Sequence, residues 1–220
     1  MKVMIFGASG MVGQGILREC LLDNGIDKVL SVGRSASGSA HQKLSDVLLA
    51  DVTRIDSIAS TLHGYDACFF CLGVSSAGMT EERYSVLTYD LTLAVARALV
   101  AINPAMRFIY ITGAGTDSSE QGRSMWARVK GRTENALFAL PFKSAHMLRP
   151  AIIQPMHGIR SKTAWYRLAS VLLAPVMPLC KRVFPGYFTT SEQVGRAMIS
   201  LARNGSPKQI LETGDINAIQ

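Results

Sequence analysis

Apolar and polar positions follow two different periods along the chain, and the changes between these periods divide it into elements. Short apolar runs rich in β-branched and aromatic residues predict strands at 2–6, 28–32, roughly 43–50, 67–72, 107–112 and 145–153. Most of these runs are separated by stretches with helical spacing. Strands that alternate with helices are typical of a parallel sheet covered on both faces. The pattern therefore predicts an α/β, doubly wound fold.

Two helices have clear signals. The longest candidate spans 80–103, where Thr80 can cap the first turn and Pro104 ends the pattern. Acidic residues in its first turn suit the positive end of a helix. The second candidate spans about 123–139 and carries Lys130. Both lie between predicted strands, as crossover helices should.

After residue 155 the pattern changes to an apolar, basic stretch interrupted by three prolines. We interpret 156–190 as a lid or substrate-side segment, part of a small C-terminal helical region of a single domain spanning 1–220. A dimer surface or a peripheral membrane contact through 160–188 is the alternative. Residues 191–202 then predict a surface helix, and 208–216 a final edge strand.

Composition narrows the classes of partner and compartment. The chain has 220 residues, 48% of them hydrophobic, and a formal net charge of +7. This charge favours anionic ligands, but the basic residues are scattered, so we expect no nucleic-acid partner. The four cysteines form no disulfide framework, and Cys68 and Cys71 fall within a predicted buried strand. We therefore expect a cytoplasmic protein with structural cysteines.

Three glycines directly follow the first predicted strand. Gly7, Gly10 and Gly13 stand at a G-x-x-G-x-x-G spacing between that strand and the next helix. Glycines at this place allow a tight turn and let the backbone approach a pyrophosphate, while the start of the helix offers free N–H groups to the anion. The spacing and position predict a Rossmann-type dinucleotide site.

The end of the second strand indicates which dinucleotide is bound. An acidic residue about 20 residues after the glycines would bind the ribose 2′-hydroxyl of NAD. This chain has Arg34 and Ser35 there, and no carboxylate. These side chains suit a 2′-phosphate, so we expect NADP. Asp51 and Val52, after the third strand, are candidates for contact with the adenine edge.

At this point the chain resembles the short-chain dehydrogenase/reductase superfamily, in its atypical or extended branch, which is also labelled NAD-dependent epimerase/dehydratase-like. The resemblance covers roughly residues 1–155 and is greatest to the Tat-interacting-protein oxidoreductase-like group. It rests on GASGMVG at 7–13, CLG at 71–73, ITG at 111–113, VKG at 129–131 and LRPAII at 148–153. It implies that the cofactor is lined by Gly7, Ser9, Gly10, Met11, Val12, Cys71, Leu72, Gly73, Pro150, Ala151 and Ile152.

The same resemblance implies three catalytic positions. Thr112 falls where the family has a hydroxyl near the reacting carbonyl, and Lys130 where a lysine holds the nicotinamide ribose. Trp126 stands where the family has a tyrosine that transfers a proton. An indole N–H only donates and does not ionise usefully, so it cannot complete a reversible proton transfer.

Three interpretations of this tryptophan remain open. Hydride transfer persists with another proton source, which is Thr112 through water, Tyr84 or Tyr89 on the long helix, or Lys130 itself. Alternatively, the protein binds NADPH and senses its redox state without turnover. In the third, it has lost the cofactor and serves as a scaffold. The intact glycine loop favours the first two.

Other polar groups follow the predicted strands without forming a recognisable site. Ser75 and Ser76 come after the fourth strand, and His157 after the sixth. The four histidines lack clustered carboxylates or paired cysteines, so we expect no metal site. Nucleotide-sugar epimerisation is a weaker alternative, because few residues remain for a substrate domain.

The sequence thus predicts an NADP(H)-binding oxidoreductase that transfers hydride to or from a small carbonyl or alcohol. The identity of this small-molecule substrate stays open. The oligomeric state stays open as well, with a homodimer as one alternative by analogy with the superfamily.

Overall fold

One parallel sheet organises the molecule, and the predicted fold class is confirmed. The computed structural model describes residues 1–159 and 185–219. Its main sheet has seven strands in the order β3-β2-β1-β4-β5-β6-β9. The strands are β1 (Lys2–Phe6), β2 (Lys28–Gly33), β3 (Leu44–Leu48), β4 (Ala67–Phe70), β5 (Arg107–Ile111), β6 (Ser144–Arg149) and β9 (Ile210–Glu212).

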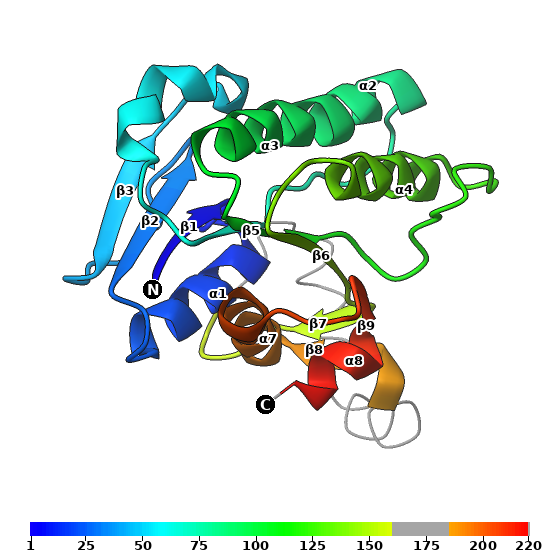
Figure 1. The fold of residues 1–220 in the computed structure, drawn as a ribbon. Helices are drawn as coiled ribbons and strands as arrows, with labels where there is room; N and C mark the ends of the chain where they lie inside the picture. Colours follow the sequence, from blue (N-terminus) through cyan, green and yellow to red (C-terminus); the bar gives the residue numbers. More distant parts are fainter. Residues whose placement is uncertain (160–184, 220) are drawn as a thin grey trace.

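Helices cover both faces of this sheet (Figure 1). On one face lie α1 (Met11–Leu22) and α7 (Ser191–Asn204). On the other lie the 3₁₀ helix η1 (Val52–Thr61), α3 (Leu91–Ile102) and α4 (Met125–Phe138). The short helices are α2 (Glu81–Ser85), η3 (Pro185–Tyr187) and α8 (Thr213–Ala218).

Alternation along the central strands creates two hydrophobic cores. Val3 and Ile5 of β1 belong to the core beneath α1 and α7. Met4 and Phe6 belong to the core beneath η1, α3 and α4. Successive side chains of a strand point to opposite faces, so a strand with apolar residues throughout is buried on both sides. This explains why β1 appears in the sequence as an uninterrupted apolar run.

The predicted helix at 80–103 is present, with an irregular turn in its middle. Thr80 caps α2 by accepting a hydrogen bond from the Arg83 N–H at 3.4 Å. A π-helical turn, η2 (Val86–Asp90), connects α2 to α3. By length and composition Glu81–Ile102 could also cross a membrane. Val95 and Leu99 within this stretch belong to the core against the sheet.

The sixth predicted strand is two strands. The run at 145–153 divides at Pro150 into β6 and β7 (Ile152–Gln154), and β7 leaves the main sheet. It pairs in parallel with β8 (Phe188–Thr190) in a small second sheet. Most of the predicted lid, 160–184, lies outside the described residues, so the lid, the membrane contact and the single-domain assignment stay predictions.

The strand order places a ligand-binding crevice beside β1. From β1 the chain proceeds outward through β2 and β3 on one side, and through β4, β5 and β6 on the other. In open α/β sheets, ligands bind outside the carboxyl ends of the strands at such a switch point. The glycine loop follows β1 directly at this point.

Candidate cofactor-binding and active site

The loop between β1 and α1 has no room for side chains at two of its glycines. Gly7 has φ of +88°, and a Cβ there would lie 3.1 Å from the carbonyl of Cys71. A Cβ on Gly13 would lie 2.1 Å from the carbonyl oxygen of Gly7. The Gly10 N–H donates to the same oxygen at 3.0 Å. The glycines thus let α1 begin directly against the loop, as the motif predicts.

The start of α1 is suited to an anion. Gly10 is its N-cap and supplies no side-chain hydrogen bond, and the first turn has no acidic residue. The first N–H groups of a helix have no partner within the helix, and its N-terminus carries partial positive charge. The Gln14 amide donates to the Ser9 carbonyl at 3.1 Å and fixes the loop. The backbone at Met11 and Val12 is therefore available to a pyrophosphate.

A pocket of about 120 Å³ adjoins this loop. Most of the residues predicted to bind the adenosine end of the cofactor line it. The Ser35 and Ser9 hydroxyls lie 3.2 Å apart, which connects the loop after β2 with the loop after β1. Arg34 is exposed and makes no ion pair with a described residue. The pocket is lined by Gly7, Ala8, Ser9, Ser31, Val32, Gly33, Arg34, Ser35, Val52 and Leu72.

Asp51 differs from its neighbour Val52. Its carboxylate accepts hydrogen bonds from the Thr53 N–H at 3.0 Å and the Thr53 hydroxyl at 2.6 Å, and so caps η1. These bonds lower the Asp51 pKa. The carboxylate therefore already has partners within the chain, whereas Val52 lines the pocket. Contact between Asp51 and adenine stays a prediction.

The segment after β4 continues the strand toward the crevice. The Cys71 N–H donates to the Phe6 carbonyl at 2.9 Å, Leu72 lines the pocket, and Gly73 is exposed. Burial raises the pKa of the Cys68 and Cys71 thiols. A raised pKa disfavours the reactive thiolate, which supports the structural interpretation of this C-x-x-C pair. Cys180 lies outside the described residues.

The segment after β6 lies at the carboxyl end of that strand and is held by two hydrogen bonds. The Pro150 carbonyl accepts a hydrogen bond from the Ala114 N–H at 3.0 Å, and the Ala151 N–H donates to the Thr213 hydroxyl at 2.9 Å. Ile152 is 39% exposed despite being a large apolar residue. Its exposure at the carboxyl end of the sheet agrees with the predicted contact to a nicotinamide.

The helix α4 brings Lys130 to the end of β5. The Lys130 ammonium donates a hydrogen bond to the Thr112 carbonyl oxygen at 2.6 Å. Burial lowers the pKa of Lys130 to about 8, and the nearby Glu134 opposes this shift. Trp126, one turn earlier on α4, lies over the glycine-rich loop, where a Cβ on Gly115 would be 3.6 Å from its ring. The two side chains thus flank the end of β5.

A buried ionic network lies behind Lys130. Glu134 is fully buried and forms two hydrogen bonds with the guanidinium of Arg149, with Nε to Oε1 at 3.1 Å and Nη2 to Oε2. The Arg149 guanidinium also donates to the Ser118 hydroxyl at 2.5 Å. This network connects α4, β6 and the loop after β5. Sequence reasoning missed Glu134, because a glutamate one turn from Lys130 on a helix gives no local indication that it is buried.

Thr112 belongs to this network through its hydroxyl. The residue is 7% exposed, and its Oγ1 lies 2.7 Å from Glu134 Oε1 and 3.2 Å from the Leu148 carbonyl oxygen. The hydroxyl thus has partners within the chain, while the backbone carbonyl holds Lys130. A role beside the reacting carbonyl stays a prediction.

The two tyrosines considered as proton sources lie elsewhere. Tyr84 is 2% exposed, and burial raises its pKa. The ring of Tyr89 lies 4.3 Å from the Arg132 guanidinium carbon. Two residues correspond to about 200° of rotation on a helix, so Arg132 projects from the side of α4 opposite Lys130. Tyr89 therefore contacts a residue on the side of α4 opposite Lys130, which does not place its hydroxyl in one site with that lysine.

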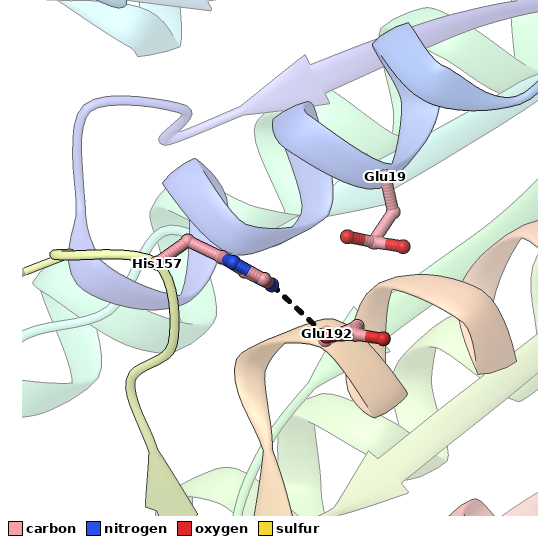
Figure 2. Close-up of side chains that lie close together, drawn as sticks. All are labelled: Glu19, His157 and Glu192. Atoms are coloured by element: carbon pink, nitrogen blue, oxygen red, sulfur yellow. Dashed lines mark hydrogen bonds and ion pairs between the residues drawn. The ribbon is translucent and has the colours of Figure 1, made fainter.

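His157 takes part in an ionic cluster between α1 and α7 (Figure 2). Its Nε2 lies 3.0 Å from Glu192 Oε2, and the ligand atoms of Glu19, His157 and Glu192 lie within 4.8 Å of one another. Arg18 pairs with Glu19, and Arg196 pairs with both glutamates. A metal cation would have to compete with two guanidinium groups for these carboxylates. We therefore interpret the cluster as a set of ion pairs that connects α1 with α7. Ser75 and Ser76 lie in the loop after β4.

Comparison with known proteins agrees with this geometry. Residues 7–140 match the sequence model of a family described as NAD(P)H-binding. The chain belongs to this NAD(P)H-binding family. Its curated relatives include HTATIP2 and FMP52 proteins, in agreement with the resemblance to the Tat-interacting group, and a solved structure of a short-chain dehydrogenase family protein shares its fold.

Two curated relatives define the extent of this similarity. Protein HTATIP2 of Rattus norvegicus is 27% identical over 154 residues, which cover 69% of this chain and 62% of the rat protein. The chain thus spans less than two thirds of that relative's length. Protein FMP52, mitochondrial, of Eremothecium gossypii is 28% identical over 221 aligned positions, covering 98% of this chain and 96% of the fungal protein.

A solved structure shows the same fold. The enzyme WbmF of Bordetella bronchiseptica, in complex with NAD+, superposes with a TM-score of 0.69. The match covers 98% of this chain and 76% of WbmF, at 16% sequence identity. This identity supports a shared Rossmann architecture and no closer functional relation.

The cytoplasmic expectation requires correction. Several fungal relatives in this family are named as mitochondrial proteins. The expectation rested on reduced cysteines, which describe a redox environment and do not distinguish one reducing compartment from another.

Proposed function

We propose that the protein is an NADP(H)-dependent oxidoreductase that transfers hydride to or from a small carbonyl or alcohol. The observation that carries this proposal is the pocket beside the glycine loop, where Ser9, Arg34 and Ser35 come together without a carboxylate in the lining. Membership of the NAD(P)H-binding family supports the cofactor class. The choice of NADP over NAD rests on Arg34 and Ser35.

The chemistry of these groups favours a phosphate. A guanidinium donates paired hydrogen bonds to phosphate oxygens, and hydroxyls add further donors. The ribose hydroxyls of NAD would instead need an acceptor such as a carboxylate. Since Arg34 is exposed and has no ion-pair partner among the described residues, it can bind a 2′-phosphate without first breaking an ion pair.

The opposite end of the crevice supports the reaction class. Lys130 lies at the end of β5, and the family uses a lysine at this position to hold the nicotinamide ribose. Ile152 offers an exposed apolar surface for the ring. When bound, the nicotinamide would supply or accept a hydride, while the chain orients the substrate and handles the proton.

A titration of the purified protein with NADPH and with NADH tests the cofactor. We expect NADPH to bind at micromolar or lower concentration and NADH much more weakly. Replacement of Arg34 by Ala should weaken NADPH binding by roughly 10- to 100-fold, the usual contribution of a hydrogen bond to a charged group. NADH affinity should change by less than about twofold, because NADH lacks the phosphate.

Arg97→Ala is the matched control, since Arg97 is an exposed arginine on α3 outside the pocket. Equal effects of the Arg34 substitution on both nucleotides would contradict the phosphate contact. If neither nucleotide binds to the unmodified protein, the proposed function fails, and the scaffold interpretation replaces it.

A second candidate is an NADPH sensor without turnover, which the presence of Trp126 favours. Both candidates predict tight NADPH binding, so affinity does not distinguish them. Oxidation of NADPH in the presence of a panel of small aldehydes and ketones does. Tight binding with no oxidation above the rate of free NADPH would favour the sensor.

A further inference from the structure

The replacement of the family tyrosine by Trp126 leaves the proposed reaction without its usual proton source. The geometry removes most of the other candidates. Tyr84 is buried, and Tyr89 packs against the opposite side of α4. The Thr112 hydroxyl is directed to Glu134. Of the candidates identified in the sequence, Lys130 alone combines a transferable proton with a place at the carboxyl edge of the sheet.

Lys130 also has hydrogen-bonding capacity to spare. An ammonium group carries three N–H donors. One is directed to the Thr112 carbonyl at 2.6 Å, and no ion pair occupies the others among the described residues. Lys130 as a residue is partly exposed, but its ammonium is largely enclosed by the surrounding chain, so a ligand contacts Nζ only if it sits directly against the end of β5. One remaining N–H can hold a ribose hydroxyl while the other faces a substrate oxygen.

We propose that Lys130 is itself the general acid and base of this site, in place of the missing tyrosine. This proposal rests on the proposed oxidoreductase function. In the direction of reduction, a bound reduced nicotinamide would supply a hydride, with its two electrons, to the carbonyl carbon and would itself be oxidised. The carbonyl oxygen takes a proton from Nζ, so that one N–H bond breaks and one O–H bond forms. Water then returns a proton to the neutral amine.

The surroundings of Lys130 suit this role. Burial brings its pKa to about 8. An acid works best when its pKa lies near the operating pH, and an ordinary lysine would be too weak an acid. At pH 7 most of the group remains protonated and ready to donate. The lowered pKa therefore suits Lys130 to donate a proton at a site where Trp126 offers none that it can transfer.

Two neighbours keep the proton donor in place. The Thr112 carbonyl accepts a hydrogen bond from either the ammonium or the neutral amine, so Nζ stays fixed throughout the cycle. Glu134, one turn further along α4, favours the charged form by its negative charge. Because Arg149 also pairs with Glu134, this carboxylate is itself held rigidly. We assign Glu134 as a positioning residue.

Substitution by arginine separates proton transfer from binding. Lys130→Arg keeps a positive charge and a donor for the Thr112 carbonyl, but a guanidinium does not release its proton in proteins. NADPH affinity should stay within a few fold of the unmodified protein. Reduction of 4-nitrobenzaldehyde should fall by roughly 100-fold or more, the usual contribution of general acid catalysis. Lys143→Arg, at an exposed lysine outside the network, should change neither quantity.

The two possible failures are distinct. If the unmodified protein binds NADPH but reduces no carbonyl probe, the proposed oxidoreductase function fails. If it reduces the probe and Lys130→Arg does so equally well, the function stands and the assignment of Lys130 is overturned. Thermal melting of each variant shows whether a loss of activity reflects unfolding.

A measurement without cofactor or turnover tests the same group. Trace labelling with acetic anhydride across a pH series, followed by peptide mass spectrometry, reports the fraction of each lysine in its neutral form. Lys130 should reach half of its maximal reactivity near pH 8, whereas exposed Lys143 should do so above about pH 10. Equal titration of the two lysines, or no labelling of Lys130 at any pH, would overturn the proposal.

Discussion

Trp126 is the residue on which the proposed chemistry of this site depends most. Its indole lies over the loop at Gly115, one turn of α4 before Lys130. An aromatic ring at this place can shape the crevice and orient an oxygen through its N–H group. Because the indole cannot both give and take a proton, our proposal assigns proton transfer to Lys130. In our proposal, Trp126 and the lowered pKa of Lys130 are two parts of one arrangement.

Restoring the tyrosine tests this interpretation. In Trp126→Tyr, the phenol would lie one turn from an ammonium group, which favours its ionised form. Carbonyl reduction should therefore rise by about 10-fold or more, since a second proton donor enters the site. Trp126→Phe is the control, because it keeps an aromatic ring and adds no donor. A similar loss of activity in both variants would show that the indole has its own role.

Residue patterns predicted the cofactor-binding residues better than the buried Glu134 and Arg149 network behind Lys130. The glycine loop and the pair Arg34 and Ser35 carry local signals, and the structure brings them together around one pocket. Glu134 carries no such signal by itself. Its burial makes sense only because Arg149 from β6 neutralises it, and that contact depends on the tertiary fold. A buried charged residue of this kind can therefore be recognised only when the fold shows which residue of opposite charge pairs with it.

At the scale of elements, the contact between α4 and the preceding loop determines where Lys130 lies. Gly131, which follows Lys130, packs directly on the backbone of that loop. A Cβ on Gly131 would lie 1.7 Å from the Asp117 carbonyl oxygen. The VKG sequence thus places the lysine of our proposal beside the glycine that lets its helix approach the loop.

Gly131→Ala should accordingly destabilise the protein and disturb the lysine. Overpacking of a tight contact usually costs about 1–3 kcal/mol, which exceeds the gain of roughly 1 kcal/mol from removing a helical glycine. NADPH affinity should fall as well. Urea unfolding and NADPH titration measure the two effects.

Gly214→Ala provides the comparison for that variant. Gly214 lies in α8 with no atom near its absent Cβ, so alanine there should leave stability unchanged or slightly higher. Equal stability of the two variants would contradict the tight packing of α4.

The sequence predicted the strands of the main sheet but not the second sheet. A strand buried on both faces is visible as an apolar run, whatever it pairs with. The pairing of β7 with β8 connects residues that are more than 30 positions apart, and each strand has three residues. Such short pairings depend on where the rest of the fold brings the chain. The π-helical turn η2 gave no sequence signal either.

At the scale of the whole molecule, net charge and local hydrogen bonds act together at low pH. The formal charge is +7 at pH 7, and protonation of carboxylates would increase it. Several carboxylates have lowered pKa values because they accept hydrogen bonds, as Asp117 does from Ser119, Glu192 from His157 and Asp215 from Lys208. Both effects should weaken the fold in acid.

The sign of this pH dependence follows from linkage. A carboxyl whose pKa is lowered by folding stabilises the protein above its unfolded pKa, near 4, and this stabilisation disappears as pH falls through the folded value. The free energy of unfolding should therefore decrease from pH 6 to pH 3. Urea unfolding at constant ionic strength measures it.

Glu192→Gln should show a smaller decrease over the same range, because one of these carboxyl groups has been removed. Its cost at pH 7 should be below about 1 kcal/mol, as is usual for an exposed ion pair. A pH profile identical to that of the unmodified protein would contradict a contribution from the His157 contact.

The parallel pairing of β7 and β8 joins two segments of the chain outside the main sheet. Gln154 and Thr190 are register partners, so the chain departs from the crevice and rejoins it at a single place. The Met156 N–H donates to the Ser191 hydroxyl at 3.1 Å and secures the same junction. The described hydrogen bonds of Gly7, Gly10 and Lys130 go to Val32, Gly7 and Thr112, all of which lie outside β7 and β8. Sequence change within the small sheet therefore leaves these particular bonds intact, so the two parts of the chain are free to diverge at different rates.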